Sequence, residues 1–170
     1  MKLRLGPLDS GDIGQARVWR NDFRIMEWTR QSDFISDSDQ VKWFNRQAED
    51  PTIKMYKVIL ERDEKPDVMV GVAGLTSIDF KSSRAEFSLY INPDLQRRGL
   101  GKGALTMLLN HAFDNLGLAQ VHGETFVGNP ALTMFIGLGM RVDGRRRDFY
   151  WKAGRLIGAD LLSITREEWY

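Results

Sequence analysis

The strongest pattern of polar and apolar positions lies between residues 85 and 116. Side chains alternate from Ala85 to Ile91, which predicts a strand with two distinct faces. Glu86, Ser88 and Tyr90 share one face, and Phe87, Leu89 and Ile91 share the other. From Leu100 to Leu116 apolar residues recur at helical spacing, and Gly117 suits the end of a helix. The pattern therefore predicts a strand, a glycine-rich turn and a long helix.

The rest of the chain also divides into helical and strand patterns. Helices are expected around Ile13–Trp19, after a cap at Asp9 or Ser10, and around Val41–Ala48, after a cap at Ser36. Strands are expected at Leu3–Leu5, Lys54–Glu61, Val68–Ile78, Gln120–Phe126, Met140–Arg147, Asp148–Lys152 and Leu156–Ile164. A short helix is expected at Pro130–Leu138, a hairpin turn at Ala153–Arg155 and a short tail at Arg166–Tyr170.

Hairpins of strands flank a single strand–helix–strand unit in this order of elements. The expected fold class is therefore α/β (α+β), with helices around a mixed sheet. No internal repeat, low-complexity segment or linker divides the sequence. We expect one domain, residues 1–170, long enough to bury a substantial core.

Composition and charge exclude several classes of protein and site but do not identify the function. The chain is 42% hydrophobic and 28% charged, and its net charge of +1 gives no global attraction to nucleic acid or an anionic membrane. It has no cysteine and two histidines, which excludes a disulfide and a thiol nucleophile, and we expect no metal site. No apolar run approaches the ~20 residues that span a bilayer, and no apolar segment follows the basic start, so a cytoplasmic protein is expected.

The turn before the central helix has the composition of an anion-binding site. Its glycines and cations are Gly99, Gly101, Gly103, Arg97, Arg98 and Lys102. Glycine lets an anion approach the backbone, where the free N–H groups of the first helical turn and the helix dipole favour negative charge. The cations strengthen that preference, so we expect a phosphate-bearing ligand here.

Two common phosphate motifs do not explain this turn. Gly99-x-Gly101-x-x-Ala104 satisfies the relaxed dinucleotide fingerprint, but residues 92–98 separate it from the preceding strand. A P-loop requires Ser or Thr after Lys102, where this chain has Gly103.

The same turn carries a resemblance to a known family. Residues 96–101, Gln-Arg-Arg-Gly-Leu-Gly, are similar to the Gln/Arg-x-x-Gly-x-Gly/Ala motif with which the GNAT N-acetyltransferase superfamily holds the pyrophosphate of acetyl-coenzyme A (acetyl-CoA). Trp19–Asp22, Ala112–Leu118 and the ending from Val142 to Trp169 resemble its RimJ/RimL-type branch, so the resemblance covers essentially the whole chain. It implies a splayed, mostly antiparallel sheet flanked by helices, with acetyl-CoA as co-substrate where two strands part.

The resemblance also implies which residues bind the cofactor. Backbone N–H groups at Leu89 and Ile91 are expected to hold the pantetheine arm and the thioester oxygen, while the turn holds the phosphates. Asn129 resembles the family asparagine that contacts the cofactor. The expected cofactor-binding residues are Leu89, Ile91, Gln96, Arg97, Arg98, Gly99, Leu100, Gly101, Lys102, Asn129 and Phe135.

Two residues are expected in catalysis. Glu86 is the candidate general base that removes a proton from the acceptor amine, and its alternative is a solvated or salt-bridged strand glutamate. The family often places a tyrosine, as the acid for the leaving thiolate, where this chain has Phe135, so that role does not carry over. Tyr90 is a stand-in on the Glu86 face, or else an ordinary packed tyrosine, and Phe135 is expected to form an apolar wall beside the thioester.

The predicted function is transfer of an acetyl group from acetyl-CoA to a primary amine. The acceptor is a protein or peptide N-terminus, a polyamine or an amino sugar, and the protein is a monomer or homodimer without nucleic-acid or membrane partners. Two alternatives stay open: a non-catalytic acyl-CoA-binding sensor or partner protein, and a nucleic-acid-binding module. The second would use Arg145–Arg147 with the aromatic residues Phe149–Trp151.

Overall fold

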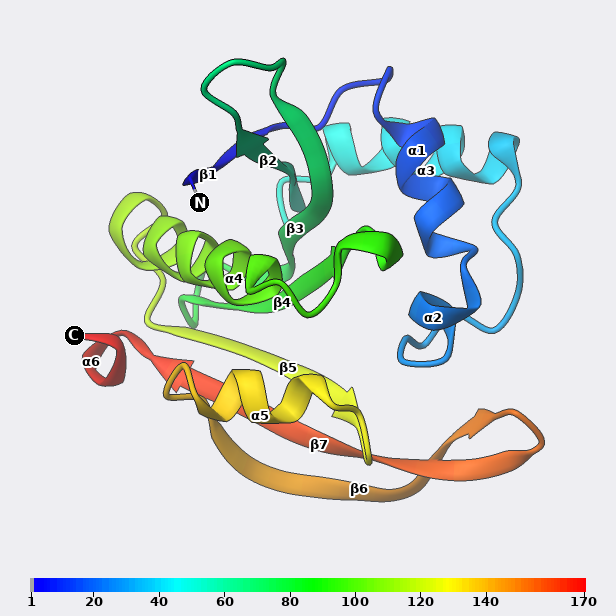
Figure 1. The fold of residues 1–170 in the computed structure, drawn as a ribbon. Helices are drawn as coiled ribbons and strands as arrows, with labels where there is room; N and C mark the ends of the chain where they lie inside the picture. The colour runs from blue at the N-terminus through cyan, green and yellow to red at the C-terminus, as the bar shows by residue number, and fades with distance from the viewer. Residues whose placement is uncertain (1) are drawn as a thin grey trace.

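Seven strands form one sheet in the computed structural model, which describes residues 2–170. The strands are β1 (Lys2–Pro7), β2 (Lys54–Glu61), β3 (Val68–Asp79), β4 (Arg84–Ile91), β5 (Gln120–Phe126), β6 (Arg141–Lys152) and β7 (Arg155–Thr165). Their order is β1-β2-β3-β4-β5-β7-β6, and every neighbouring pair is antiparallel except β4 with β5 (Figure 1). The predicted mixed, mostly antiparallel sheet is confirmed.

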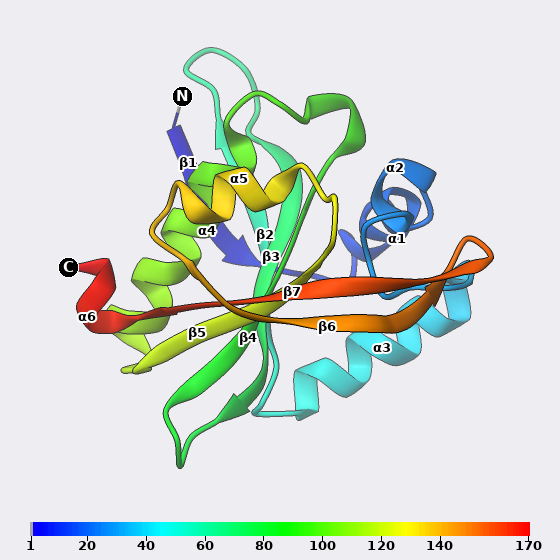
Figure 2. The same ribbon diagram turned by 90° about the horizontal axis from the view of Figure 1, so that it is seen from below.

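Helices cover both faces of this sheet (Figures 1 and 2). They are α1 (Ile13–Arg20), α2 (Phe23–Met26), α3 (Asp37–Glu49), the 3-10 turn η1 (Pro93–Leu95), α4 (Leu100–Asn110), the π-helical turn η2 (His111–Asn115), α5 (Ala131–Ile136) and α6 (Arg166–Trp169). No helix within residues 2–170 is both long enough and apolar enough to cross a membrane.

Two apolar cores, one on each face, hold the layers together. The larger core packs α4 against the sheet around Leu105, Leu108 and Phe113, all fully buried. The smaller core packs α1 against the other face, with Trp19 and Tyr90 among its members. The alternation predicted for β4 is confirmed, because its odd-numbered residues from Phe87 to Ile91 join the α4 core and Tyr90 joins the α1 core.

The sheet is divided at its centre. β4 and β5 pair in parallel over only three residues, Arg84–Glu86 with Gln120–His122, and then separate. In Figure 1 the two strands diverge beyond this point, so that β1–β4 and β5–β7 form two halves. The gap opens directly after Glu86 and lies in front of the turn at the start of α4.

Several local expectations were wrong. The residue before α1 is Asp12 rather than Asp9 or Ser10. Its carboxylate makes no cap hydrogen bond, because the Asp9 N–H and Lys57 Nζ donate to it. The central helix loses α-helical geometry after Asn110 and continues as one π turn. The two strands expected between Met140 and Lys152 are one bulged strand, β6, with Asp148 at a φ of 48°.

The end of the chain also differs from the expected tail. Residues 166–169 form α6, which begins with a capping box: the Thr165 hydroxyl accepts from the Glu168 N–H, and the Glu168 carboxylate accepts from the Thr165 N–H. The cap satisfies the first free N–H groups of the helix, which explains why so short a segment is helical.

Candidate active site

Backbone groups of β4 point into the gap. The Asn92 N–H donates to the Val70 carbonyl at 2.8 Å, so Asn92 and Val70 form a hydrogen-bonded pair of the β3–β4 ladder. Such pairs alternate along antiparallel strands, so the N–H and C=O groups of Phe87, Leu89 and Ile91 face away from β3. Beyond the last β4–β5 pair these groups meet no strand. The gap therefore presents free donors and acceptors at Leu89 and Ile91.

The turn between η1 and α4 presents a second set of free donors. Arg97 and Gly99 both have left-handed backbone conformations, with φ of 61° and 79°, which turn the chain sharply into α4. The first intrahelical bond runs from the Gly103 N–H to the Gly99 carbonyl at 3.1 Å. The N–H groups of Leu100, Gly101 and Lys102 therefore have no helical partner and are free to bind an anion.

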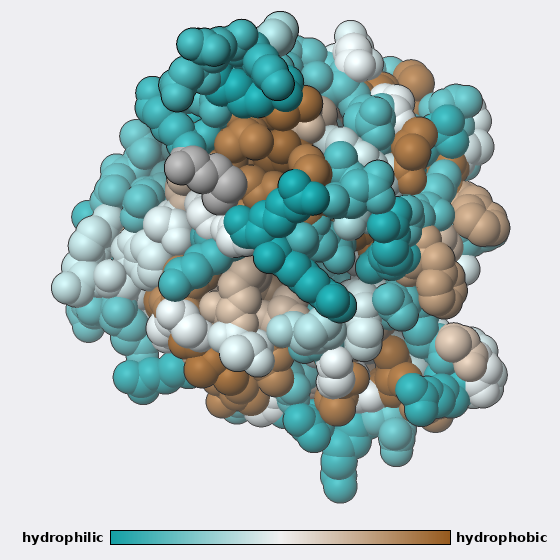
Figure 3. Space-filling view, in the orientation of Figure 1, coloured by the Kyte–Doolittle hydropathy of each residue, from teal (hydrophilic) through white to brown (hydrophobic). Residues whose placement is uncertain are grey.

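Uncompensated positive charge surrounds these donors. Arg97, Arg98 and Lys102 are exposed, and no acidic side chain within residues 2–170 forms an ion pair with them. Figure 3 shows hydrophilic side chains across the middle of this face of the molecule, with apolar surface above and below them. The free N–H groups and the three cations together suit a phosphate.

Two of the glycines in this turn have packing roles as well. A Cβ atom at Gly103 would lie 2.8 Å from Leu3 Cδ1 of β1, so this glycine lets α4 approach the sheet. At Gly101 a Cβ atom would lie 3.3 Å from Met134 Sδ of α5. The expectation that all three glycines serve ligand approach was thus too broad, because Gly103 faces the protein interior.

The remaining expected cofactor residues lie around the gap. Gln96 is exposed at the end of η1, whereas the Leu100 side chain is buried in the larger core. Asn129 precedes α5, where its Oδ1 accepts from the Ala131 N–H at 3.0 Å. Phe135 is buried and packs edge to face against Phe87 of β4, with ring centroids 5.2 Å apart. An apolar side chain therefore reaches from α5 to the strand that borders the gap.

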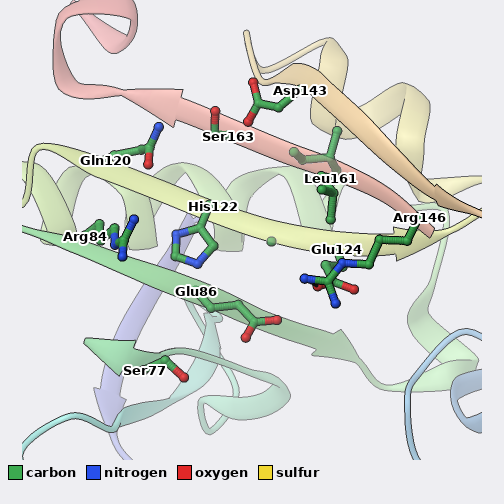
Figure 4. Close-up of a pocket in the computed structure, with 12 residues that line it drawn as sticks. Ser77, Arg84, Glu86, Gln120, His122, Glu124, Asp143, Arg146, Leu161 and Ser163 are labelled. Atoms are coloured by element: carbon green, nitrogen blue, oxygen red, sulfur yellow. Dashed lines mark ion pairs between the residues drawn. The ribbon is translucent and has the colours of Figure 1, made fainter. Parts of the chain in front are cut away.

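Carboxylates gather on the other face of the parting strands. Glu86 of β4, His122 and Glu124 of β5 and Asp143 of β6 line a cavity of about 410 Å³ (Figure 4). Glu86 and His122 are direct partners in the short parallel ladder, and Glu124 lies two residues further on the same face. Glu86, the expected base, therefore lines this cavity at the point where β4 and β5 begin to separate.

Glu86 and Glu124 are both paired with arginines. Arg30 Nη2 lies 2.5 Å from Glu86 Oε1, and Arg146 Nη2 lies 3.2 Å from Glu124 Oε1. The Tyr150 hydroxyl donates to Glu124 Oε2 at 2.6 Å. Burial and this hydrogen bond raise the pKa of Tyr150, so the phenol keeps its proton at neutral pH.

Tyr90 lies on the same face of β4 but inside the smaller core. Only 9% of its surface is exposed, and the Arg20 guanidinium lies 5.5 Å from its ring centroid. Burial raises the pKa of Tyr90 far above that of a free phenol, although Arg20 opposes the shift. Tyr90 is thus a packed, protonated tyrosine, and its role as an acid stays a prediction.

A known protein family matches most of the chain. Residues 2–139 match the family described as acetyltransferase (GNAT) domain. The chain belongs to this family. The acetyltransferase uses acetyl-CoA as co-substrate and transfers the acetyl group to an amine nitrogen, as predicted from the Gln96–Gly101 motif. The interpretation as a non-catalytic acyl-CoA-binding protein is therefore not supported.

Relatives span nearly the full length of this acetyltransferase. An uncharacterized N-acetyltransferase p20 from Bacillus licheniformis is 25% identical, covering 99% of this chain and 94% of that protein. A spermidine N(1)-acetyltransferase from Vibrio cholerae is 22% identical, covering 99% and 95%. The structure of the Vibrio cholerae spermidine N-acetyltransferase with CoA and spermine superposes with a TM-score of 0.90, at 22% identity, over 98% of this chain and 97% of that one. The superposition shows that the two proteins share a fold.

Three residues of the acetyltransferase site were not predicted from the sequence. Arg30 and Tyr150 come from segments far from β4, and no local pattern connects them with Glu86. Glu124 lies on β5, and no sequence motif gave it a role. The one available signal was the alternation of Gln120–Phe126, which places His122 and Glu124 on one face of a strand.

Two of the three arginines in β6 are held in ion pairs while their side chains stay partly exposed. Arg145 Nε lies 2.6 Å from Asp160 Oδ1, whose side chain is buried, and Arg146 binds Glu124. Only Arg147 of the three is without a carboxylate partner within residues 2–170. Since ion pairs occupy two of the three arginines, the nucleic-acid interpretation loses its main feature.

Proposed function

We propose that this chain, acting as one domain over residues 1–170, acetylates a polyamine-type acceptor. The observation that carries the proposal is the parting of β4 and β5 directly after Glu86, with a phosphate-type site at one end of the gap and a carboxylate cavity at the other. This arrangement holds a long, phosphate-bearing acyl donor and a cationic amine on opposite sides of one reaction centre.

The residues around the gap fit coenzyme A. The free backbone groups of Leu89 and Ile91 suit the amides of the pantetheine arm, which would continue the sheet as an added strand. The side chains of Gln96, Arg97, Arg98 and Lys102 suit the pyrophosphate. So do the Gly99 turn and the free N–H groups of Leu100, Gly101 and Lys102. The bound cofactor supplies the acetyl thioester.

Two further residues complete the proposed cofactor site. The side-chain oxygen Oδ1 of Asn129 accepts from the Ala131 N–H, which leaves Nδ2 as a donor to the cofactor. Phe135 lies against β4 through Phe87 and forms an apolar wall that keeps water from the acetyl group. The role proposed for Phe135 requires no hydroxyl group.

Proton transfers determine the rest of the chemistry. An alkylamine with a pKa near ~10 arrives as an ammonium ion, and Glu86 takes its proton directly or through a water molecule. The neutral amine then attacks the thioester carbon, and collapse of the adduct breaks the C–S bond while the nitrogen releases its second proton to water. The leaving thiol has a pKa of about 8.5, judged from cysteine, so its thiolate departs readily and takes a proton from water or Tyr90.

The number of carboxylates in the cavity supports a polyamine among the possible acceptors. Glu86, Glu124 and Asp143 line one cavity with Arg84 and Arg146, so a flexible chain with several ammonium groups can meet more than one carboxylate if it displaces the arginines paired with them. Similarity to the spermidine acetyltransferase of Vibrio cholerae over nearly the whole chain supports the same choice. The finer assignment to a RimJ/RimL-like branch, and with it a peptide N-terminus as acceptor, remains the competing prediction.

An acceptor panel tests this proposal. Spermidine, spermine, a diamine, a peptide with a free N-terminus, an α-amino acid and an amino sugar are each mixed with acetyl-CoA, and free thiol release is followed. We expect the highest kcat/KM with spermidine or spermine. A higher kcat/KM with the peptide would overturn the polyamine assignment, and no thiol release with any amine would overturn the proposed function itself.

A further inference from the structure

Arg30 occupies the position on Glu86 where a cationic acceptor would bind. It lies between α2 and α3 and reaches the sheet with its side chain 54% exposed, whereas the Glu86 side chain is 16% exposed. The 2.5 Å contact between Nη2 and Oε1 is charge-assisted, the same kind of contact that an ammonium group makes with a carboxylate. Arg30 is thus bound to the carboxylate oxygen with which Glu86, the proposed base, would take a proton.

The guanidinium also lies near the second carboxylate of the cavity. Tyr150 and Glu124 are both within electrostatic range of Arg30, and Arg146 binds the other side of Glu124. Arg30 therefore binds Glu86 of β4 and also interacts with Tyr150 and Glu124. An acceptor amine that approaches Glu86 on this face must compete with it.

The backbone on both sides of Arg30 is fixed, so the side chain is the part free to move. Lys152 Nζ, at the end of β6, donates to the Thr29 carbonyl at 3.0 Å and to the Gln31 carbonyl. The Gln31 side chain donates to the Asp33 carbonyl and accepts from Arg20 Nε at 3.0 Å. The half-exposed guanidinium can turn into solvent without any movement of this loop.

Resting on the proposed function, we infer that Arg30 is an internal counter-ion that the acceptor ammonium displaces from Glu86, and that this exchange sets the KM for the amine. Between turnovers Arg30 keeps a largely buried carboxylate paired, which avoids the high cost of an isolated buried charge. When the amine binds, one cation replaces another on the same oxygen. Arg30 is a positioning residue in this scheme, because the proton leaves the ammonium for Glu86.

The scheme makes a prediction with a definite sign. Arg30→Gln keeps a hydrogen-bond donor near Glu86 but removes the competing charge, so the KM for the amine should fall by about tenfold, the scale of one charge-assisted hydrogen bond. The KM for acetyl-CoA should stay unchanged. Arg30→Lys restores a cation and should restore a KM near that of the wild type. The same variants would raise the amine KM if Arg30 instead helped to bind the acceptor.

Salt dependence provides a second readout that a purely structural role would not produce. In the wild type one cation replaces another, so the amine KM should change little between about 0.05 and 0.5 M salt. In Arg30→Gln the ammonium joins an unpaired carboxylate, so its KM should rise with salt.

The matched control is Arg62→Gln. Arg62 is an exposed arginine in the β2–β3 turn whose Nε donates to the Pro66 carbonyl at 2.8 Å, so the variant removes the same charge without contacting the cavity. Steady-state rates are measured for the wild type, Arg30→Gln, Arg30→Lys and Arg62→Gln, and melting temperatures confirm that each protein is folded. An amine KM in Arg30→Gln that equals or exceeds those of the wild type and Arg62→Gln would overturn the inference. Absence of turnover by the wild type would instead overturn the proposed function.

Discussion

Glu86 occupies an unusual position for a strand glutamate. It is the last residue of β4 that pairs with β5, its side chain is mostly buried, and its near cation comes from a loop rather than from a neighbouring strand. The ion pair with Arg30 is what the alternative, a salt-bridged strand glutamate, also predicts. The role of Glu86 in proton transfer stays a prediction, and the two explanations differ in what a change to Gln does to the rate.

Replacing Glu86 by Gln tests that role. The amide keeps the shape of the side chain and can still accept a hydrogen bond, but it cannot take a proton at neutral pH. We expect kcat to fall on the order of 10²-fold, the usual contribution of one acid–base group, in thiol-release assays with saturating acetyl-CoA. Ser88→Ala, two residues along the same face, is the control and should keep most of the activity. Wild-type rates in Glu86→Gln would remove Glu86 from the mechanism.

Tyr90 and Phe135 form a second pair of residues for a test. Phe135→Tyr adds a hydroxyl where relatives often carry one, and it should change kcat little because thiolate departure is undemanding near neutral pH. Tyr90→Phe removes the buried phenol and should cost less than about tenfold in kcat, below the usual general-acid contribution. Both variants are measured at several pH values with the best acceptor from the panel.

Opposite results would change the assignment of the acid. A loss of kcat well beyond tenfold in Tyr90→Phe, at an unchanged melting temperature, would make the phenol essential. A large gain in Phe135→Tyr would show that protonation of the thiolate limits the wild-type rate.

At the scale of elements, the turn and first helical turn of α4 together form the proposed anion site. Gly99 supplies the left-handed backbone, the next three N–H groups are free, and three cations surround them. Each contribution is small by itself, since an exposed charge at a helix terminus is worth about 0.3–1 kcal/mol. Only their convergence on one short segment gives an affinity for pyrophosphate.

Gly101→Asp is the sharpest test of this element. It places a carboxylate among the free N–H groups and should weaken coenzyme A binding at least about tenfold by calorimetry, which corresponds to 1.4 kcal/mol. Gly101→Ala is the matched control, because it adds the same Cβ atom against Met134 without the charge. Equal affinities for the two variants would show that packing, not charge, explains any loss. An affinity unchanged from the wild type in Gly101→Asp would place the phosphates elsewhere.

At the scale of the whole molecule, the sheet consists of two halves joined by few strand contacts. Three residue pairs connect β4 to β5, and the cores under α4 and α5 connect the rest. A pantetheine arm that bonds to the free edge of β4 would fill part of this gap. Coenzyme A binding should therefore stabilise both halves of the sheet against unfolding.

Thermal unfolding measures that stabilisation. At a coenzyme A concentration of 100 times its Kd, binding adds about 2.7 kcal/mol, which corresponds to a Tm increase of about 5–10 °C for a domain of this size. Amide exchange should slow at Leu89 and Ile91, whose N–H groups face the gap. The same experiment with Gly101→Asp provides the control. A Tm increase without protection at Leu89 and Ile91 would contradict the proposed strand-like binding of the pantetheine arm.

The sequence by itself determined the elements that depend on local periodicity. The predicted bounds of β2 and β5 are those observed, and the two faces of β4 were assigned correctly. The same holds for the Ser36 cap of α3, whose hydroxyl accepts from the Asp39 N–H. These features follow from backbone geometry and side-chain spacing within a few residues. The motif at Gln96–Gly101, together with the similar segments along the rest of the chain, predicted the family, because such motifs are short stretches of sequence that can be recognised without the fold.

Only the tertiary structure decided where the strands part and which charges meet there. The short β4–β5 pairing, the contact of Arg30 with Glu86 and the contact of Tyr150 with Glu124 join residues that lie far apart in the chain. The packing of Gly103 against Leu3 is of the same kind. Such contacts depend on how whole elements pack, and hydrophobic periodicity specifies the face that an element buries but not the neighbour it meets. The chemistry of the site was therefore visible in the residues, whereas its electrostatics were set by the fold.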